Sequence, residues 1–522
     1  MVDSFKEKLL SHYGLNEADF ASFCLAPDIS KIPTLEGCLE ASKAKDIVLE
    51  AIGHNQKAIV YGDYDCDGVM ATSIICHLFH LLKGSIASYL PSRYIDQYGL
   101  NMTNAEKIAN NGYKLVILVD NGICCLDEIA YLKQRGIKVI VIDHHEPGAT
   151  LPNADAILHP QTLPYGDYPV SAGYLSFLFS YLLLGYPEGR CLTMGALSTI
   201  SDMMILKGHN REIVRLALQE LHAHPSGNPI ASLCSCPADE IDEGTLSMDV
   251  APKINSIGRY IDDSKINRLA HFFGGELTPD QYQAYITWME AINEERKELT
   301  KRAIDEASID ENEPAVFHIG TLKEGLNGIL ANRFLQNYNK PSLVCSPSSK
   351  ESDLYVGSLR AKEGCSVLSF LEENESLFVR YGGHQLAAGV AFKKENAEAV
   401  KSALFAYASA HPFDDENADA IEIIPGEVSA ANFATIRALG PYGFGFPRPE
   451  FILKDISTSS LSYSHSQLHM LTPLPKGGTI LGFGYSRSYL STFDYVDIYG
   501  TFAYAKDRDH CDFKVSAILE SV

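Results

Sequence analysis

Short continuous runs of apolar residues alternate with longer helical patterns through the first half of the chain. The runs at residues 57–61, 114–119 and 138–142 predict strands, and the stretches 69–83 and 126–135 predict helices. Polar residues do not alternate with apolar ones inside these runs, which is typical of strands covered on both faces. The pattern therefore predicts an α/β domain with a parallel sheet and crossover helices.

Beyond this region the pattern changes from one segment to the next. A charged helical pattern spans about residues 279–308, and a second α/β unit follows it. The C-terminal region holds short β patterns separated by Gly and Ser, which predict a small β-barrel. The polar run at residues 414–417 marks a boundary before it. We therefore expect five regions: a helical N-terminal extension (1–55), the first α/β domain (56–278), a connecting helix (279–309), a second α/β domain (310–412) and the barrel (420–522).

The composition is that of an ordinary globular protein, with 46% hydrophobic and 21% charged residues in 522. This length exceeds what a single core supports, in agreement with several domains. The formal net charge is −23. Such acidity argues against a generally basic protein that coats nucleic acid, but it leaves room for a local basic groove.

The cysteines and the apolar stretches indicate the compartment. None of the 12 cysteines has zinc-finger spacing, so we expect reduced thiols and a cytoplasmic location. The N-terminus lacks the apolar core of a signal peptide. The most apolar stretch, residues 172–185, is shorter than the roughly 20 residues that cross a bilayer. We expect a buried helix there and no membrane contact.

Three aspartates occupy alternate positions directly after the first predicted strand, in the pattern Asp63-x-Asp65-x-Asp67. In an extended chain alternate side chains point to the same side, so these three would converge. Carboxylates at close range repel one another unless a cation lies between them. Taken alone, the motif fits an acidic surface turn as well as it fits half of a metal site.

The other candidate acids also lie at the ends of predicted elements. Asp120 follows the second strand, Asp143, His144 and His145 follow the third, and Asp202 ends a helix. Sites in open parallel sheets lie beyond the carboxyl ends of the strands, so this shared placement favours a metal site. Carboxylates with one or two imidazoles suit Mn²⁺ or Mg²⁺ and also admit Zn²⁺. Two such ions form a common clamp for phosphoester cleavage.

These motifs resemble those of the DHH phosphoesterase superfamily, whose name-giving motif matches Asp143-His144-His145. Its first motif matches the three aspartates with Gly68, its second matches Asp120-Asn-Gly122, and its fourth ends at Asp202. Within the superfamily the chain is most similar to the RecJ-like single-strand exonucleases, over about residues 50–522. Further matching segments are Asn255-Ser-Ile-Gly258-Arg259, His318-Ile-Gly320, Gly328-Ile-Leu-Ala-Asn-Arg333, Gly357-Ser358-Leu-Arg360, Arg380-Tyr-Gly382-Gly383-His384 and Leu439-Gly-Pro-Tyr-Gly443.

The resemblance implies a fold and a role for each matching residue. The two α/β domains would be a DHH domain and a DHHA1 domain, and the barrel would be of the oligonucleotide-binding (OB) type. Two ions would share the ligands Asp63, Asp65, Asp67, Asp120, His144 and Asp202, with Asp120 as the bridge. The groups at the scissile phosphate would be His145, Asp143, Arg259 and His384. The residues that bind substrate, including a pocket for a terminal 5′-phosphate at Arg93, Ser358 and Arg360, would be Arg93, Tyr98, Asn255, Arg333, Ser358, Arg360, Gly382 and Gly383.

The implied activity is that of a metal-dependent 5′→3′ exonuclease on single-stranded DNA in repair, recombination or replication. Single-strand-binding or helicase proteins would be its partners. Two alternatives stay open: a DHH phosphodiesterase for short oligonucleotides or cyclic dinucleotides, and a RecJ-like scaffold in a replication complex. The barrel favours long strands, because small substrates need no second platform with stacking aromatics. Phe444, Phe446 and Tyr485 could stack on bases, although each is more typical of a core residue. The intact metal ligands disfavour a scaffold, and the preference between DNA and RNA stays open.

Overall fold

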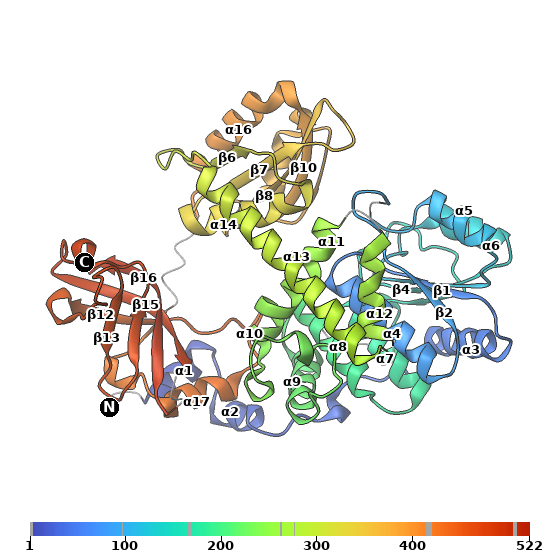
Figure 1. Ribbon diagram of the computed structural model, residues 1–522, viewed down its shortest axis with the longest axis horizontal. Coiled ribbons are helices and arrows are strands. Elements are labelled where there is room, and N and C mark those ends of the chain that lie inside the picture. Colours follow the sequence, from blue (N-terminus) through green and yellow to red (C-terminus); the bar gives the residue numbers. More distant parts are fainter. Residues whose placement is uncertain are drawn as a thin grey trace. The chain divides into compact units, whose positions relative to one another are not determined.

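The structure is a computed structural model in which the chain forms two compact units (Figure 1). The larger unit comprises residues 33–204 and 217–415, and the smaller unit comprises 1–32, 205–216 and 416–522. The polar run at 414–417, expected to mark a boundary, lies outside the described residues, and the five domain limits remain a prediction. The described residues are 4–96, 98–163, 169–261, 264–275, 277–413, 420–504 and 509–521.

The larger unit contains the predicted parallel sheet. Its five strands lie in the order β2-β1-β3-β4-β5, and every neighbouring pair is parallel. The sequence pattern did not predict the two edge strands, because β2 is only half-buried and β5 has three residues. The strands are β1 (Ala58–Tyr61), β2 (Ile86–Tyr89), β3 (Leu115–Val119), β4 (Lys138–Ile142) and β5 (Ala156–Leu158).

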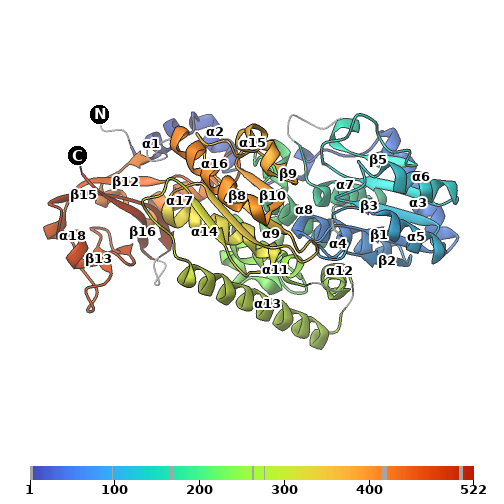
Figure 2. The ribbon, with the colours of Figure 1, turned by 90° about the horizontal axis from the view of Figure 1, so that it is seen from above.

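Helices cover both faces of this sheet (Figures 1 and 2). The helices α5 (Met102–Asn110) and α6 (Leu126–Gln134) share a core with one set of alternate strand residues, such as Val116. The helices α4 (Cys66–Leu81) and α7 (Ala172–Leu184) pack on the opposite face. Both faces of β3 are buried, which explains why its sequence is a continuous apolar run.

Of the remaining helices in this part of the chain, α8 and α12 pack on α4, and α3 packs on β5 and α7. No described helix combines the length and the apolar character that a membrane crossing requires. The helix α9 belongs partly to each unit. These helices are α3 (Leu39–Gly53), α8 (Gly189–Ser201), α9 (Gly208–Ala223), α10 (Glu243–Thr245), α11 (Ala251–Tyr260) and α12 (Arg268–Gly274).

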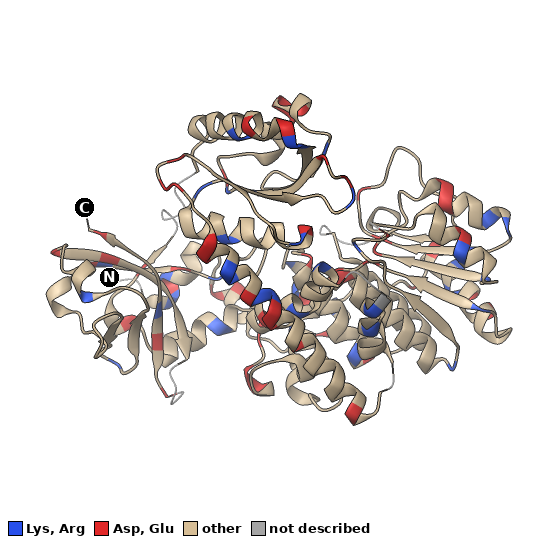
Figure 3. Ribbon diagram, turned by 45° about the horizontal axis from the view of Figure 1, so that its top comes forward, with Lys and Arg blue, Asp and Glu red and all other residues tan. Residues whose placement is uncertain are grey.

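The predicted connecting helix is α13 (Pro279–Glu306), 28 residues long. It begins with a capping box, in which Thr278 accepts a hydrogen bond from the backbone of Gln281 and the Gln281 side chain accepts one in return. Acidic and basic residues are interspersed along it (Figure 3), and pairs such as Lys297–Glu294 lie on its exposed surface. The helix is therefore largely solvated, as its charge pattern predicted.

The second α/β region of the larger unit is a mixed five-stranded sheet in the order β6-β7-β8-β10-β9. The helices α15 (Val367–Glu373) and α16 (Ala397–Ala410) share one apolar core with it. The helix α14 (Asn327–Tyr338) shares another. The strands are β6 (Val316–Ile319), β7 (Ser342–Pro347), β8 (Leu354–Arg360), β9 (Arg380–Gly383) and β10 (Ala387–Lys393).

The smaller unit is built on a six-stranded sheet in the order β11-β12-β15-β16-β14-β13. It also holds the helices α1 (Phe5–His12), α2 (Glu17–Phe23), α17 (Ala430–Leu439) and α18 (Arg487–Leu490). The β-rich character of the C-terminal region is thus confirmed. The strands are β11 (Ile421–Glu422), β12 (Phe451–Ser457), β13 (Met470–Pro473), β14 (Thr479–Gly482), β15 (Tyr495–Tyr504) and β16 (Cys511–Glu520).

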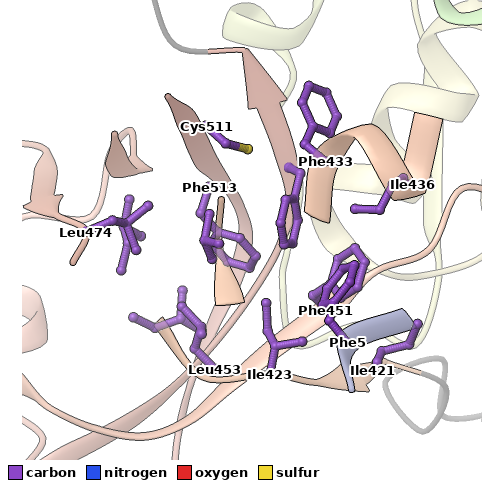
Figure 4. Close-up of a cluster of buried hydrophobic side chains, with 14 of the residues drawn as sticks. Phe5, Ile421, Ile423, Phe433, Ile436, Phe451, Leu453, Leu474, Cys511 and Phe513 are labelled. Carbon is purple, nitrogen blue, oxygen red and sulfur yellow. The ribbon is translucent and has the colours of Figure 1, made fainter. Parts of the chain in front are cut away.

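The strand pairing of the described residues does not close into the barrel that we expected. The edge strands β11 and β13 each pair with one neighbour only. Helices cover the apolar face instead: Phe5 of α1 and Phe433 of α17 share a buried cluster with Phe451, Phe502 and Phe513 of the sheet (Figure 4). Because these helices already bury the strands, barrel closure is not needed to remove them from water.

The three aromatics proposed for base stacking differ in their exposure. Phe446 is buried in the core of the smaller unit, with its ring stacked on Tyr442 at 5.5 Å between centroids. It is therefore a core residue, which is the role that we considered the more typical one for these aromatics. Phe444 is 56% exposed, and Tyr485 packs partly against the same core.

The cluster around Phe5 gives a test of how the N-terminal helix stabilises the smaller unit. The Phe5 ring lies 5.7 Å from that of Phe451 and 5.5 Å from that of Phe502. We expect Phe5→Ala to lower the opening free energy of β12 and β15 by about 3–5 kcal/mol. Hydrogen exchange of their amides measures it. Phe483→Ala, at a 63% exposed position, is the control and should change little. Unchanged exchange in Phe5→Ala would contradict this.

Candidate metal centre and phosphate pocket

The three aspartates of the first motif lie in a turn from strand to helix. The strand β1 ends at Tyr61, and α4 begins at Cys66. Asp65 caps this helix, since its Oδ1 accepts a hydrogen bond from Gly68 N at 3.1 Å. Asp65 itself has an extended backbone, but Asp67 already lies in the first turn of the helix, so the motif is not the fully extended chain that we used to predict convergence. A Cβ atom on Gly68 would lie 2.6 Å from that of Asp63, so this tight turn requires glycine.

The turn nevertheless brings the carboxylates together with the acids from the other strand ends. Ligand atoms of Asp63, Asp65 and Asp120 lie within 4.8 Å of one another. The same limit holds for two further groups that share His144. We call the whole set the acid cluster; the two further groups are Asp67, His144 and Asp202, and Asp120, His144 and His145.

Asp67 is fixed by the N-terminus of α7. Its Oδ1 accepts hydrogen bonds from Gly173 N at 2.7 Å and Ser198 Oγ at 2.5 Å, and its Oδ2 accepts one from Ala172 N at 2.9 Å. Free N–H groups and the positive end of the helix dipole stabilise a buried carboxylate at this place. Ser198, four residues before Asp202, thus holds an acid of the first motif.

Asp120 follows β3 with a backbone φ of 58°, a left-handed conformation that Asp tolerates better than most residues. Its neighbour Asn121 donates hydrogen bonds to the carbonyl groups of Gly62 at 3.0 Å and Val119 at 2.8 Å. This side chain ties the carboxyl ends of β1 and β3 together. Asp120 is therefore held in a strained turn that aims its carboxylate at the cluster.

The two adjacent histidines have different surroundings, as we expected. His144 Nε2 lies 3.2 Å from Asp120 Oδ1 and 3.5 Å from oxygens of both Asp67 and Asp202. His145 is more exposed, and its Nδ1 lies 2.8 Å from Asp143 Oδ1. His144 therefore lies among three carboxylates of the acid cluster, whereas His145 lies at its more exposed side with Asp143 as its nearest partner.

Burial and mutual repulsion make the acid cluster unstable in its fully ionised form. Burial, and next the charge of Asp65, raises the pKa of Asp63, while burial and the charge of Asp67 raise the pKa of both Asp65 and Asp120. The same two causes raise the pKa of Asp202 to about 9. Burial lowers the pKa of His144, which favours the neutral imidazole.

A divalent cation fits this set of residues. Asp63 Oδ1 and Asp120 Oδ1 are buried and have no hydrogen-bond partner among the described residues. Buried polar atoms need a partner, and a neutral imidazole beside several carboxylates is a typical donor set for a divalent ion. The cluster could therefore hold Mn²⁺ or Mg²⁺ through Asp63, Asp65, Asp67, Asp120, His144 and Asp202.

Asp143 positions His145 and is not part of the cluster. It is fully buried, and it accepts hydrogen bonds from the backbone of Ile123 at 3.0 Å and of His144 at 2.8 Å. Burial alone would lower the pKa of His145, but the hydrogen bond and charge of Asp143 raise it above the ordinary value. Tyr98 OH lies 3.0 Å from His145 Nδ1 and donates to the carbonyl oxygen of Asp120.

The larger unit also holds a cavity of about 440 Å³ that is rich in arginine. Burial, and next the charges of Arg259 and Arg93, lower the pKa of Arg360 to about 10. Three guanidinium groups that repel one another form a site that an anion would stabilise. We call it the phosphate pocket; the predicted residues that line it are Arg93, Arg259, Ser358, Arg360, Gly382 and Gly383.

The phosphate pocket lies within electrostatic reach of the acid cluster. Arg93 lies over the ring of Tyr64, 5.7 Å from its centroid, and its charge opposes the rise in the pKa of Asp63. Tyr94 OH donates to the carbonyl oxygen of Arg259 at 2.5 Å. This bond connects the loop of Arg93 to the end of α11. The turn after β2 therefore positions two of the three arginines.

Three further predicted residues belong neither to the acid cluster nor to the residues that line the phosphate pocket. His384 is exposed in the turn between β9 and β10, and Arg333 is exposed on α14 beside Gln336. Asn255 acts on the backbone: its Oδ1 accepts a hydrogen bond from Cys66 N at 2.9 Å. It therefore holds the first turn of α4, and through it Asp65 and Asp67.

Sequence reasoning did not find His159, which follows β5. Its Nδ1 accepts a hydrogen bond from Gln161 N, so its Nε2 carries the proton and donates to the carbonyl oxygen of His145 at 2.8 Å. The buried ring thus fixes the backbone of the two-histidine motif. Its place at a strand end was the available signal, but β5 is too short to be recognised from its pattern.

Comparison with known proteins identifies the first domain. Residues 57–189 match the model of the DHH family, N-terminal domain. They form a DHH domain. This match ends before Asp202 and before the residues of the phosphate pocket other than Arg93. The recognition of the DHH motifs from the sequence is therefore confirmed.

Most of the chain is similar to RecJ proteins. It is 29% identical to the single-stranded-DNA-specific exonuclease RecJ of Bacillus subtilis over 79% of this chain and 54% of that protein. It is 26% identical to RecJ of Haemophilus influenzae over 84% of this chain and 82% of that protein. The chain thus spans about half the length of the Bacillus relative.

Two solved structures support the fold. A crystal structure of RecJ in complex with Mn²⁺ from Thermus thermophilus superimposes with a TM-score of 0.82 and 22% identity, covering 99% of this chain and 76% of that one. A structure of exonuclease RecJ bound to manganese has a TM-score of 0.60 and 25% identity, covering 73% of this chain and 97% of that one. The fold of this chain is therefore similar to that of the RecJ structures.

The raised pKa values predict that metal binding releases protons. At neutral pH a group such as Asp202, with a pKa of about 9, is mostly protonated, whereas a bound cation requires the carboxylate. Calorimetric titration with Mn²⁺ in buffers of different ionisation enthalpy should therefore give heats that depend on the buffer, and affinity should rise with pH. Asp202→Asn should release fewer protons. Heats independent of the buffer would contradict the raised pKa values.

Proposed function

We propose that this protein is a metal-dependent exonuclease that hydrolyses phosphodiester bonds of single-stranded DNA from the 5′ end. The observation that carries the proposal is the acid cluster beside an arginine-lined pocket in one compact unit. The names of the RecJ relatives support the activity and the single-stranded substrate. Manganese in the two solved RecJ structures supports this ion, and a third RecJ structure, also from Thermus thermophilus, contains Mg²⁺.

The acid cluster would hold the metal ions, with Asp120 as the shared ligand. Its position supports this role, because Asp120 belongs to two of the three groups of ligand atoms. Bound ions would acidify a water molecule and stabilise charge on the phosphoryl oxygens. Asp143 would orient His145 toward the scissile phosphate, and Tyr98 would limit the movement of that imidazole.

The phosphate pocket would bind the terminal 5′-phosphate. Arg93, Arg259 and Arg360 supply planar groups that meet phosphate oxygens in pairs, and Ser358 adds a hydroxyl group. A terminal phosphate carries more charge than an internal phosphodiester, so the arginines favour a strand end. Strand polarity would thus be read by this pocket and not by the metal ions.

The remaining details of the function are part of the same proposal. His384 and Arg333, which are exposed, would contact the strand only in the complex. Reduced cysteines agree with a cytoplasmic location, since all 12 are free thiols in the structure. Single-strand-binding or helicase proteins would act as partners.

The direct experiment is digestion of end-labelled single strands, DNA and RNA side by side, with Mn²⁺ and after chelation. We expect shortening from a 5′-phosphorylated end and no cleavage without metal. Cleavage after exhaustive chelation would end the metal proposal. Activity on very short oligonucleotides alone would favour the alternative of a short-oligonucleotide phosphodiesterase. No cleavage with either ion would favour a scaffold.

Asp120→Asn tests the shared ligand. Asn tolerates the left-handed backbone of this position, so the fold should persist. Removing the charge should lower Mn²⁺ affinity beyond the roughly 10- to 100-fold that the loss of an outer partner costs, and turnover by several orders of magnitude. Asp127→Asn, an exposed acid on α6, is the matched control and should keep wild-type activity. If Asp120→Asn kept most of its activity, Asp120 would be only a structural acid.

Arg360→Ala tests the reading of polarity. We expect it to reduce cleavage of 5′-phosphorylated strands far more than of 5′-hydroxyl strands, so that the two rates become nearly equal. Arg360→Lys should recover the rate only in part, because an ammonium group restores charge without the paired geometry. Arg302→Ala, at an exposed ion pair on α13, should leave the ratio unchanged. A wild-type enzyme that ignores the 5′-phosphate, or starts at the 3′ end, would refute the pocket.

A further inference from the structure

A short segment of chain joins Asp202 of the acid cluster to the smaller unit. Asp202 directly follows α8 in the larger unit, and residues 205–216 already belong to the smaller unit. Only Met203 and Met204 lie between them. The backbone of these two residues therefore connects one acid of the cluster to the smaller unit.

The carboxylate of Asp202 is less firmly held than those of Asp65 and Asp67. Asp67 accepts three hydrogen bonds, and Asp65 caps α4. Among the described residues, none donates a hydrogen bond to the Asp202 carboxylate, and His144 Nε2 lies 3.5 Å from it. The place of this carboxylate is therefore set mainly by its own backbone.

That backbone is strained at the next residue. Met203 has a φ of 52°, in the left-handed region that glycine usually supplies at the end of a helix. Its N–H donates to the carbonyl oxygen of Ile200 at 3.2 Å, and that of Met204 donates to Thr199 at 3.1 Å, as in a Schellman motif. Met203 is 64% exposed, so packing of its side chain does not offset the strain. Such a conformation persists only where the surrounding structure enforces it.

The turn at residues 443–446 of the smaller unit holds the residues that follow. Leu206 is buried, and its N–H donates to the carbonyl oxygen of Phe444 at 2.8 Å. Gly445 has a φ of 74°, and a Cβ atom on it would lie 2.9 Å from Cγ2 of Ile205. Because a β-branched side chain has little rotamer freedom, Ile205 cannot easily avoid such a methyl group.

We infer that the turn at 443–446 positions Asp202 for metal binding, through residues 203–206. This inference rests on the proposed metal centre and concerns how one of its ligands is held. The turn fixes Leu206 and so keeps Met203 in the left-handed region. Without the turn, Met203 relaxes toward an ordinary conformation and the Asp202 carboxylate loses its place beside His144. The coupling is reciprocal, so a bound ion also stabilises the contact of Leu206 with the turn.

Calorimetric titration of the full-length chain with Mn²⁺ alone, without nucleic acid, tests this inference. Gly445→Ala presses a methyl group on Ile205 and should weaken Mn²⁺ binding roughly 10- to 100-fold, as the loss of an outer partner does. Gly484→Ala is the matched control: its φ of 86° imposes the same strain, but the added methyl group meets no described atom within 4 Å. It should bind Mn²⁺ like the wild type. A Gly445→Ala protein that melts cooperatively and binds Mn²⁺ like the wild type overturns the inference.

Met203→Gly separates positioning from a general loss of stability. Glycine adopts the left-handed region without strain, so residue 203 no longer needs the turn to hold it there. Met203→Gly combined with Gly445→Ala should therefore regain most of the Mn²⁺ affinity. No recovery would show that Gly445→Ala acts only through instability of the smaller unit, and the positioning role would be refuted.

Reciprocity gives a second readout that does not depend on a substitution in the turn. Saturating Mn²⁺ should slow hydrogen exchange of the Leu206 amide in the wild type and should not do so in Asp202→Asn. Exchange that Mn²⁺ leaves unchanged in the wild type contradicts the coupling. If Asp202→Asn binds Mn²⁺ like the wild type, Asp202 is not a ligand and the metal centre itself must be revised. If Asp202→Asn weakens binding and Gly445→Ala does not, only the role of the turn fails.

Discussion

Repulsion among carboxylates at one edge of the parallel sheet is the main constraint on the site of the larger unit. Asp63, Asp120 and Asp143 follow three adjacent strands whose carboxyl ends meet there. The protein relieves part of the repulsion with helix N-termini, which bind Asp65 and Asp67. It leaves the rest unrelieved, as the raised pKa of Asp202 shows. A cluster in this state is stable as charged groups only with a cation.

The phosphate pocket is constrained in the same way, but by repulsion among positive charges. Arg93, Arg259 and Arg360 repel one another and are partly removed from water. Arg93 reaches Asp63 electrostatically, but neither cluster is neutralised by the other, since the pKa of Asp63 stays raised and that of Arg360 stays lowered. In the proposed function each cluster gains its missing counter-charge from outside the protein: metal ions on one side and a phosphate on the other.

Backbone contacts set the distance between these opposed clusters. The Tyr94 hydroxyl group holds the end of α11, and Asn255, one turn earlier in that helix, holds the start of α4. Gly328 of α14 lies directly beside the pocket, since a Cβ atom there would lie 2.9 Å from the guanidinium group of Arg360 and would displace it. Small residues and single hydrogen bonds thus place charged side chains whose own interactions would drive them apart.

The sequence by itself determined the parallel sheet, the long charged helix and the acids at the strand ends, because each of these follows from local pattern. Tertiary structure decided the rest. The turn at Cys66, and not an extended chain, brings Asp63 and Asp67 to one site. Helices from both ends of the chain cover the C-terminal sheet, so the expected barrel does not close and Phe446 is buried. These outcomes depend on contacts such as Phe5 with Phe451, between residues hundreds of positions apart, which local pattern cannot reveal.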